Sequence, residues 1–158
     1  MKTVVVLSDT HGNAGGIEGL DNILSESDYI IHLGDTSADG ARIARKYPGK
    51  TYLINGNCDA MRCGENELVI EIEDIRIFAT HGHLYSVKSN LSKLAKRAKE
   101  LKCKLALYGH THRAGEEETD GVTLINPGTL SRYSRQSYCY LVINKDKAVA
   151  KTVFLDNR

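Results

Sequence analysis

Acidic side chains and histidines gather in short polar segments of this sequence, and these are the residues best suited to chemistry. Five of the six histidines lie in three such segments, Asp9-Thr10-His11, His81-Gly82-His83 and Gly109-His110-Thr111-His112. Two further segments, Gly34-Asp35 and Gly56-Asn57-Cys58-Asp59, add carboxylates and an amide. Carboxylate, amide oxygen and imidazole form a mixed ligand set that suits Mn²⁺, Fe, Co²⁺, Ni²⁺ or Zn²⁺. Mg²⁺ and Ca²⁺ prefer shells of oxygen alone and fit this set less well.

These side chains are too many for one open catalytic ion. Residues two apart in extended backbone point the same way, so Asp9 and His11 can face one cavity, as can His110 and His112. By the same spacing His83 is aimed at the rim that His81 faces. Seven ligands fit two ions about 3.5–4 Å apart that share one carboxylate.

Each polar segment in the first half of the chain directly follows a predicted strand. Residues 3–7, 29–33 and 51–54 are short apolar runs, and the apolar spacing within 17–24 and 38–47 is helical. This alternation predicts a largely parallel sheet covered by helices. The carboxyl ends of parallel strands line one crevice, where ligands bind. We therefore expect the polar segments to meet at one edge of the sheet.

The second half of the chain is richer in strands. Residues 67–72 and 75–80 predict a hairpin that turns at Glu73-Asp74, and 105–108 predicts another short strand. Three more strands are expected at 122–125, 138–143 and 148–154. His81 follows the strand predicted at 75–80, and His110 follows the strand predicted at 105–108. Both should therefore reach the same crevice.

Residues 89–101 predict an amphipathic helix with Ser89 as its N-cap. Lysines and one arginine lie opposite its apolar stripe, which is where a solvated helix face places them. No aromatic residues stand between these cations to stack on bases, so a nucleic-acid partner is not indicated.

Composition limits the class of protein. A length of 158 residues predicts one domain spanning 1–158, and 41% apolar with 26% charged residues is ordinary for a globular protein. The net charge of +1 does not indicate a bulk polyanionic partner. No apolar run approaches the about 20 residues of a membrane span, and the start of the chain does not resemble a signal peptide. We expect a cytoplasmic protein whose four cysteines are free thiols.

The order of the polar segments resembles that of the calcineurin-like metallophosphoesterases, especially their small bacterial and archaeal phosphodiesterases. The segments read SDTHGN (8–13), HLGD (32–35), NGNCD (55–59), THGH (80–83) and YGHTH (108–112), followed by INPGT (125–129). The resemblance spans essentially the whole chain. It implies an α/β (α+β) fold, a four-layer αββα sandwich of two mixed β-sheets flanked by helices.

The resemblance also implies roles for the seven ligands. Asp9, His11 and His112 would hold one ion, Asn57, His81 and His110 the other, and Asp35 would bridge both. A hydroxide held between the ions would then attack phosphorus in a phosphodiester. On this basis we expect Asp35 and Asn57 to take part in catalysis and His83 to contact substrate. The expected cofactors are two divalent transition-metal ions, Mn²⁺ first, with Ni²⁺, Fe, Co²⁺ or Zn²⁺ as alternatives.

Cys58 departs from the family pattern. Many members carry histidine there, and that histidine donates a hydrogen bond or proton near the leaving group. A thiol is a weak donor, so we predict a catalytic role for Cys58 that favours good leaving groups. Asp59 has two interpretations, orienting this neighbourhood or shaping a turn. Arg113, Arg132 and Arg135 are either phosphate contacts or ordinary surface.

Other functions remain open at the level of sequence. A non-catalytic protein-interaction scaffold of the same fold would not need the seven ligands. A phosphomonoesterase or nuclease would use the same metal site, because the walls of the site decide the substrate. We expect a small phosphodiester as the partner and no membrane association, and the resemblance implies that copies can form homo-oligomers.

Overall fold

The computed structural model describes residues 1–155, and the first of its two sheets is built around β1. In this five-stranded sheet the order is β10-β9-β1-β2-β3. Strands β1, β2 and β3 are parallel, whereas β9 and β10 run antiparallel to their neighbours. The bounds are β1 (Lys2–Leu7), β2 (Tyr29–His32), β3 (Thr51–Leu53), β9 (Ser137–Asn144) and β10 (Lys147–Phe154).

The second five-stranded sheet has the order β4-β5-β6-β8-β7. Its three central strands β5, β6 and β8 are parallel, and each edge strand is antiparallel to its neighbour. The bounds are β4 (Glu67–Ile72), β5 (Ile75–Thr80), β6 (Leu105–Leu107), β7 (Gly115–Thr119) and β8 (Val122–Asn126).

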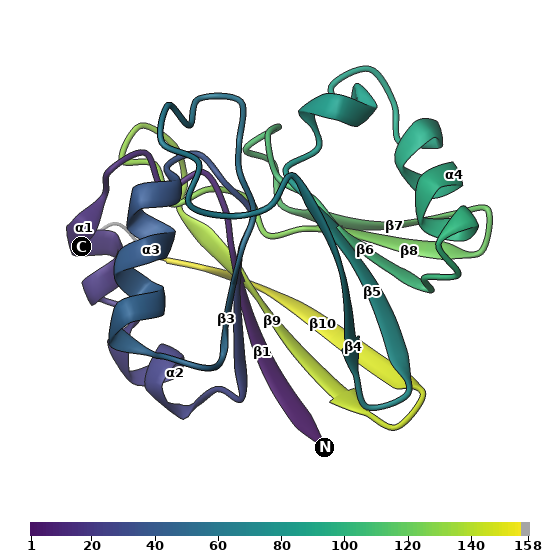
Figure 1. The fold of residues 1–158 in the computed structure, drawn as a ribbon, viewed down its shortest axis with the longest axis horizontal. Helices are drawn as coiled ribbons and strands as arrows, with labels where there is room; N and C mark the ends of the chain where they lie inside the picture. The colour runs from purple at the N-terminus through teal and green to yellow at the C-terminus, as the bar shows by residue number, and fades with distance from the viewer. Residues whose placement is uncertain (156–158) are drawn as a thin grey trace.

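Helices cover the outer face of each sheet, as Figure 1 shows. The helices α1 (Ala14–Glu18), α2 (Asp21–Glu26) and α3 (Ser37–Lys46) lie on the first sheet, and α4 (Ser92–Glu100) lies on the second. A 3₁₀ turn, η1 (His83–Tyr85), precedes α4. The four-layer αββα sandwich of two mixed sheets predicted from the resemblance is therefore confirmed.

Alternating side chains on the central strands fill three apolar layers. Val4 and Val6 of β1 pack between the sheets against residues such as Ile77. The intervening Val5 and Leu7 point to the other face, where they meet the helices of the first sheet. This two-residue alternation is the period of a strand. A third layer joins α4 to the outer face of the second sheet.

The structure corrects the predicted start of α4. The helix begins at Ser92, so Ser89 is not its N-cap; the Ser89 amide instead donates to the carbonyl of Ser86 in a turn, 2.9 Å away. The side chain of Asn90 accepts from the amide of Ser92 at 3.0 Å. The apolar stripe of α4 is buried through Leu94 and neighbouring alanines, and its lysines are exposed as expected.

Strand β7 was not expected from the sequence. It contains Glu116, Glu117 and Glu118, all exposed, and therefore shows no apolar alternation. It exists as an edge strand because β8 supplies its hydrogen-bonding partner. The single helix expected over 17–24 is also divided, into α1 and α2.

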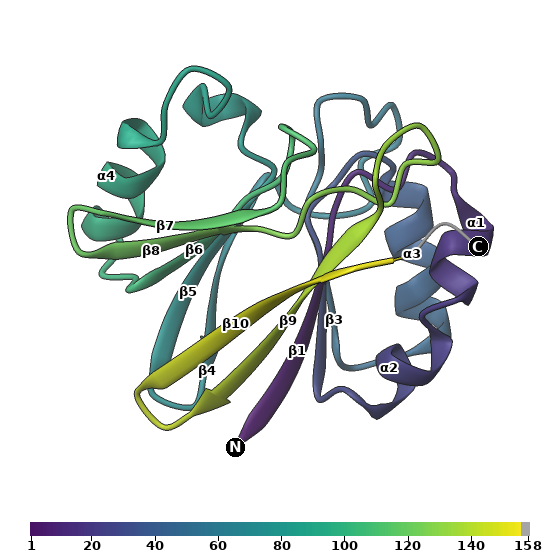
Figure 2. The ribbon, with the colours of Figure 1, turned by 180° about the vertical axis from the view of Figure 1, so that it is seen from behind.

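The two hairpin turns lie side by side at one end of the sandwich, as the rear view in Figure 2 shows. The amide of Asp74, between β4 and β5, donates to the carbonyl of Lys145, between β9 and β10, at 3.2 Å. The opposite end is left to the loops that follow the parallel strands. Among the described residues, the helices are all too short or too polar to cross a membrane.

Candidate metal centre

The loops that follow the parallel strands of both sheets meet at one edge of the sandwich. The amide of Asp9, after β1, donates to the carbonyl of Gly34, after β2, at 2.9 Å. The amide of Gly109, after β6, donates to the carbonyl of His81, after β5, also at 2.9 Å. Across the sheets, Nδ1 of His81 lies 2.8 Å from the carbonyl oxygen of Leu33. Because a carbonyl only accepts, this bond places a proton on Nδ1 and leaves Nε2 as a ligand atom.

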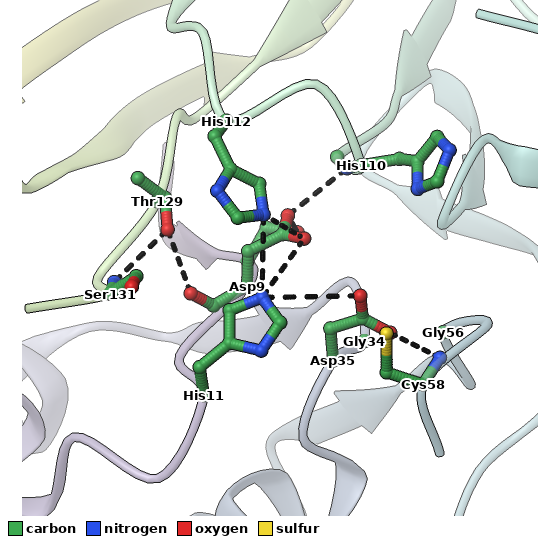
Figure 3. Close-up of polar contacts among 12 residues, drawn as sticks. Asp9, His11, Gly34, Asp35, Gly56, Cys58, His110, His112, Thr129 and Ser131 are labelled. Atoms are coloured by element: carbon green, nitrogen blue, oxygen red, sulfur yellow. Dashed lines mark hydrogen bonds and ion pairs between the residues drawn. The ribbon is translucent and has the colours of Figure 1, made fainter. Parts of the chain in front are cut away.

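Asp9, His11 and His112 form one group of close ligand atoms. Oδ1 of Asp9 lies 3.0 Å from Nε2 of His112 and 3.9 Å from Nε2 of His11. The two imidazole nitrogens are 3.3 Å apart. Figure 3 shows the two rings pointing toward the Asp9 carboxylate from opposite loops.

Asp9, Asp35 and His81 form a second group. Oδ2 of Asp35 lies 3.4 Å from Nε2 of His81 and 4.0 Å from Nε2 of His11, so this carboxylate stands between the two groups. Oδ1 of Asn57 is 3.1 Å from Nε2 of His81. Asp9 belongs to both groups, whereas the family resemblance implies that Asp35 alone would be shared.

The cluster fits metal ions on one observation in particular. Oδ1 of Asp9 is buried and accepts no hydrogen bond from the described residues. Three imidazole Nε2 atoms surround it at 3.0 to 3.9 Å, from His112, His11 and His81. A buried carboxylate oxygen without a hydrogen bond is costly, and a cation among these nitrogens would satisfy it. The nitrogen and oxygen donors suit a first-row divalent ion.

His110 and His83 lie beside the second group. The ring centroid of His110 is 5.1 Å from that of His81, and its backbone amide donates to Oδ2 of Asp9 at 3.0 Å. Its ring is turned away from Asp9 (Figure 3) and belongs to neither group. The ring of His83 is 5.5 Å from that of His81, and its Nδ1 is buried without a hydrogen-bond partner among the described residues.

Five of the seven predicted ligands have left-handed backbone conformations. The φ angles are +53° at Asp9, +45° at His11, +46° at Asp35, +70° at His110 and +59° at His112. Such angles are uncommon for residues other than glycine and persist only where the surrounding structure enforces them. The loops therefore hold these side chains in place at some conformational cost.

Two glycines allow the loops to approach closely. A Cβ atom at Gly56 would lie 2.0 Å from Oδ1 of Asp35, and one at Gly109 would lie 2.8 Å from Oδ2 of Asp9. Any side chain at these positions would displace a carboxylate of the centre, so both positions require glycine.

The electrostatics of the centre favour ionised carboxylates. Burial opposes ionisation of Asp9 and Asp35, but the neighbouring rings outweigh it, and the pKa of each carboxyl is held below its ordinary value. Burial also opposes protonation of His81, yet Asp35 and Asp9 raise its pKa. Asp9 raises the pKa of His112 in the same way. Protons on these rings therefore occupy positions that a metal ion would take.

Cys58 and Asp59 organise the loop that carries Asn57. The amide of Cys58 donates to Oδ1 of Asp35 at 2.9 Å, and its sulfur lies 3.4 Å from Nδ2 of Asn57. Burial and the Asp35 charge raise the pKa of the Cys58 thiol. The carboxylate of Asp59 accepts from the amides of Gly56, Ser37 and Asp35 at 2.6, 2.6 and 3.1 Å. Asp59 thus fixes the Asp35 loop and its own turn through backbone amides.

A buried relay supports the His11 loop and was not expected as a unit. The amide of Gly34 donates to Nδ1 of His32 at 3.2 Å, so the ring proton is on Nε2. Nε2 lies 3.1 Å from the hydroxyl of Thr10, which donates to Oδ2 of Asp39 at 2.7 Å. The amide of Gly12 donates to the same oxygen at 3.0 Å. Burial lowers the pKa of His32, so it serves here as a neutral core histidine.

The turn at 126–129 supports the remaining loop. Nδ2 of Asn126 donates to the carbonyl of Gly109 at 3.1 Å and to the hydroxyl of Thr111 at 3.0 Å. The hydroxyl of Thr129 donates to the carbonyl of Asp9 at 2.8 Å, as drawn in Figure 3. This segment belongs to the INPGT motif of the resemblance, but no sequence pattern indicates the partner of Thr129.

The three candidate arginines have different surroundings. Nε of Arg132 donates to Oδ1 of Asn13 at 3.1 Å, and Arg135 stacks 4.0 Å from the ring centre of Phe154. Arg113 follows His112 and is exposed. Arg132 and Arg135 thus have structural contacts, and Arg113 remains available to a ligand.

Comparisons with known proteins agree with this geometry. Residues 1–147 match the calcineurin-like phosphoesterase superfamily domain. A probable metallophosphoesterase of Bacillus subtilis is 34% identical over 94% of this chain and 88% of its own length. A phosphodiesterase of Methanocaldococcus jannaschii is 30% identical over 81% of this chain and 84% of its own.

The crystal structure of a predicted phosphoesterase from Streptococcus pneumoniae superposes on this chain with a TM-score of 0.79 at 26% identity. The match covers 97% of this chain and 89% of that one. With its two mixed sheets and its cluster of carboxylates and imidazoles, the chain belongs to the calcineurin-like phosphoesterase superfamily.

Proposed function

We propose that this protein is a phosphodiesterase that hydrolyses small phosphodiesters at a two-metal centre. The observation that supports the proposal is the buried Oδ1 of Asp9, which accepts no hydrogen bond from the described residues and lies among three imidazole nitrogens. The position of Asp35 between the two ligand groups supports a second ion. The name of the Methanocaldococcus jannaschii relative favours a diester over a monoester.

The ligands divide between two positions in this proposal. Asp9, His11 and His112 would hold one ion and Asn57, His81 and His110 the other, with Asp35 shared. Mn²⁺ is our first choice, with Ni²⁺, Fe, Co²⁺ and Zn²⁺ as alternatives. When bound, such ions neutralise phosphoryl oxygens and lower the pKa of water to near neutrality.

Two other groups of the chain can contact the substrate. Cys58 keeps its proton at neutral pH, because burial and Asp35 raise the pKa of its thiol. His83 stays neutral, because burial and the charge of His81 lower the pKa of its ring. In this proposal both would hydrogen-bond an ester oxygen beside the second group, and Cys58 is the weaker donor.

Hydrolysis of two p-nitrophenyl esters tests the function. Protein freed of metal with a chelator is assayed on bis(p-nitrophenyl) phosphate and on p-nitrophenyl phosphate, with Mn²⁺ or Ni²⁺ added back. Asp35→Asn removes the shared charge, and Asp146→Asn, an exposed turn residue, is the matched control. We expect metal-dependent diester cleavage that Asp35→Asn abolishes and Asp146→Asn preserves.

Other results would assign a different function. Faster cleavage of the monoester would indicate a phosphomonoesterase. Metal binding is measured by equilibrium dialysis. If the chain binds neither metal, the proposal is contradicted and the non-catalytic scaffold is favoured, because a scaffold does not need an intact ligand set.

A further inference from the structure

A cavity of about 540 Å³ lies beside the loop that carries His110 and His112. It lies between the segment that precedes α4 and the connection from β6 to β7. Val87, Lys88 and Leu91 line one side, and Tyr108, Thr111 and Arg113 line the other. Thr111 stands between the two histidines in the chain, so the loop that carries both of them forms one wall of the cavity.

Lys88 faces the same cavity from the segment that precedes α4. A group seated between Lys88 and Thr111 would therefore lie beside the loop that carries two predicted ligands rather than on a remote surface.

The wall of the cavity is fixed rather than loose. Tyr108 is 8% exposed and packs with Val87 and Leu91 in the apolar layer beneath α4. The hydroxyl of Thr111 accepts from Nδ2 of Asn126 at 3.0 Å and from the amide of Arg113 at 3.3 Å. The cavity thus has a preformed apolar side.

Two cations and one carboxylate complete the lining. Lys88 and Arg113 are both exposed, so their charged ends are open to a ligand. Glu117 lies on the β7 side, where its charge acts on Tyr108 and its Oε1 accepts from the hydroxyl of Thr119 at 3.3 Å. An anionic ligand group is favoured near Lys88 and Arg113 and disfavoured near Glu117. Guanidinium in particular suits the geometry of a phosphate.

We propose that this cavity binds one ester group of the substrate, a nucleoside-sized group that carries a further phosphate. The ring system would pack on Val87, Leu91 and Tyr108, and the further phosphate would contact Lys88 and Arg113. The volume is within the range of ligand pockets, about 300–1,000 Å³, and far exceeds the space that the scissile phosphate needs. This inference rests on the proposed phosphodiesterase function and names its substrate class.

Three diesters with the same leaving group test the inference. They are methyl p-nitrophenyl phosphate, the p-nitrophenyl ester of thymidine 5′-phosphate, and the same nucleotide ester with a 3′-phosphate. We expect kcat/KM to rise about tenfold with the nucleoside and again about tenfold with the 3′-phosphate, as an interaction with a charged group gives. Equal kcat/KM values for all three would overturn the inference and leave the proposed function intact. Failure to cleave any of them would contradict the function itself.

Substitutions then locate the binding group. The quantity compared is kcat/KM for the nucleotide ester with the 3′-phosphate divided by kcat/KM for the ester without it. Lys88→Gln and Arg113→Gln should each reduce this ratio several-fold. Lys93→Gln, an exposed lysine of α4 outside the cavity lining, is the matched control and should keep the ratio of the unaltered protein. A ratio unchanged by both cavity substitutions would overturn the assignment.

A filling substitution gives a second, independent measurement. Gly115 lines the cavity, and a Cβ atom there would meet nothing within 4 Å, so Gly115→Leu can be accommodated. We expect it to remove the advantage of the thymidine ester over the methyl ester. Retention of that advantage would place the nucleoside elsewhere and contradict the inference.

Discussion

At the scale of single residues, Cys58 is the feature that sets this centre apart from the family pattern. Its amide holds Oδ1 of Asp35, and its sulfur lies beside Asn57. The raised pKa of the thiol leaves it protonated at neutral pH, with a weaker hydrogen bond to offer than an imidazolium. A leaving group that needs a proton should therefore depart slowly.

Cys58→His should restore that proton donor. General acid catalysis contributes about 10²–10⁴-fold in rate, so we expect turnover of an alkyl phosphodiester to rise at least about tenfold. Hydrolysis of bis(p-nitrophenyl) phosphate should change little, because p-nitrophenolate leaves without a proton. Cys63→His, at another exposed cysteine of the same loop, is the matched control. An unchanged rate on the alkyl diester would show that residue 58 does not serve the leaving group.

The residues of the centre were the part most open to prediction. Acid and imidazole types after strands, together with the family resemblance, were enough to name Asp9, His11 and His81, which the structure brings into the two groups of close ligand atoms. The spacing could not show that Asp9 is shared by both ligand groups, because this depends on the left-handed turn at Asp9. The orientation of the His110 ring likewise depends on the turn after β6, which no local pattern encodes.

At the scale of elements, α3 acts as a support for the loop that carries His11. Asp39, in the first turn of α3, is buried and accepts from the hydroxyl of Thr10 and the amide of Gly12. These two donors flank His11 in the chain. The helix thereby fixes the position of a predicted ligand that it does not itself contact.

Asp39→Ala should loosen His11 and weaken metal binding. Loss of an outer partner of a ligand typically reduces metal affinity by about 10–100-fold, and stability should fall by about 1–3 kcal/mol as buried donors lose their acceptor. Competition with a chromophoric chelator measures the affinity, and urea unfolding measures the stability. Arg42→Gln, at an exposed residue 3.9 Å from the other Asp39 oxygen, is the matched control. Unchanged metal affinity would limit Asp39 to a role in folding.

Elements with clear periodicity were predicted well, and those without it were not. The strands around β1 are continuous apolar runs because both faces are buried. Strand β7 is an edge strand with exposed glutamates, so its residues show no strand pattern and it is recognised by its pairing with β8. The start of α4 depends on Asn90, whose side chain accepts from the amide of Ser92, and the serine at 89 offered a competing cap.

At the scale of the whole molecule, the metal centre joins the two halves of the sandwich. Asp9 and His11 come from the first sheet, and His81 and His112 from the second. A ligand that bridges both sheets binds the folded chain and not the unfolded one. Metal binding should therefore stabilise the whole fold and not one loop alone.

Removal of metal should lower the thermal unfolding midpoint in a pH-dependent way. At a metal concentration of 100 times Kd, the gain in unfolding free energy should be about 2.7 kcal/mol at pH 7.5. Acid should reduce this gain through protonation of the imidazole ligands. Protons compete for His81 and His112, whose pKa values are raised. Those same protonated rings stabilise the metal-free fold below the unfolded histidine pKa of about 6.5, a contribution that is lost as the pH rises through the folded values.

Calorimetry with and without Mn²⁺ at pH 7.5 and 5.5 measures the metal-induced shift of the unfolding midpoint and its dependence on pH. We expect a midpoint shift of several degrees at pH 7.5 that largely disappears at pH 5.5. Asp35→Asn should reduce the shift at pH 7.5, whereas Asp146→Asn, in the turn at the far end of the sandwich, should keep it. A metal-induced shift of equal size at both pH values would show that the ions bind away from His81 and His112. The metal would then stabilise the fold from another site and not from the centre between the sheets.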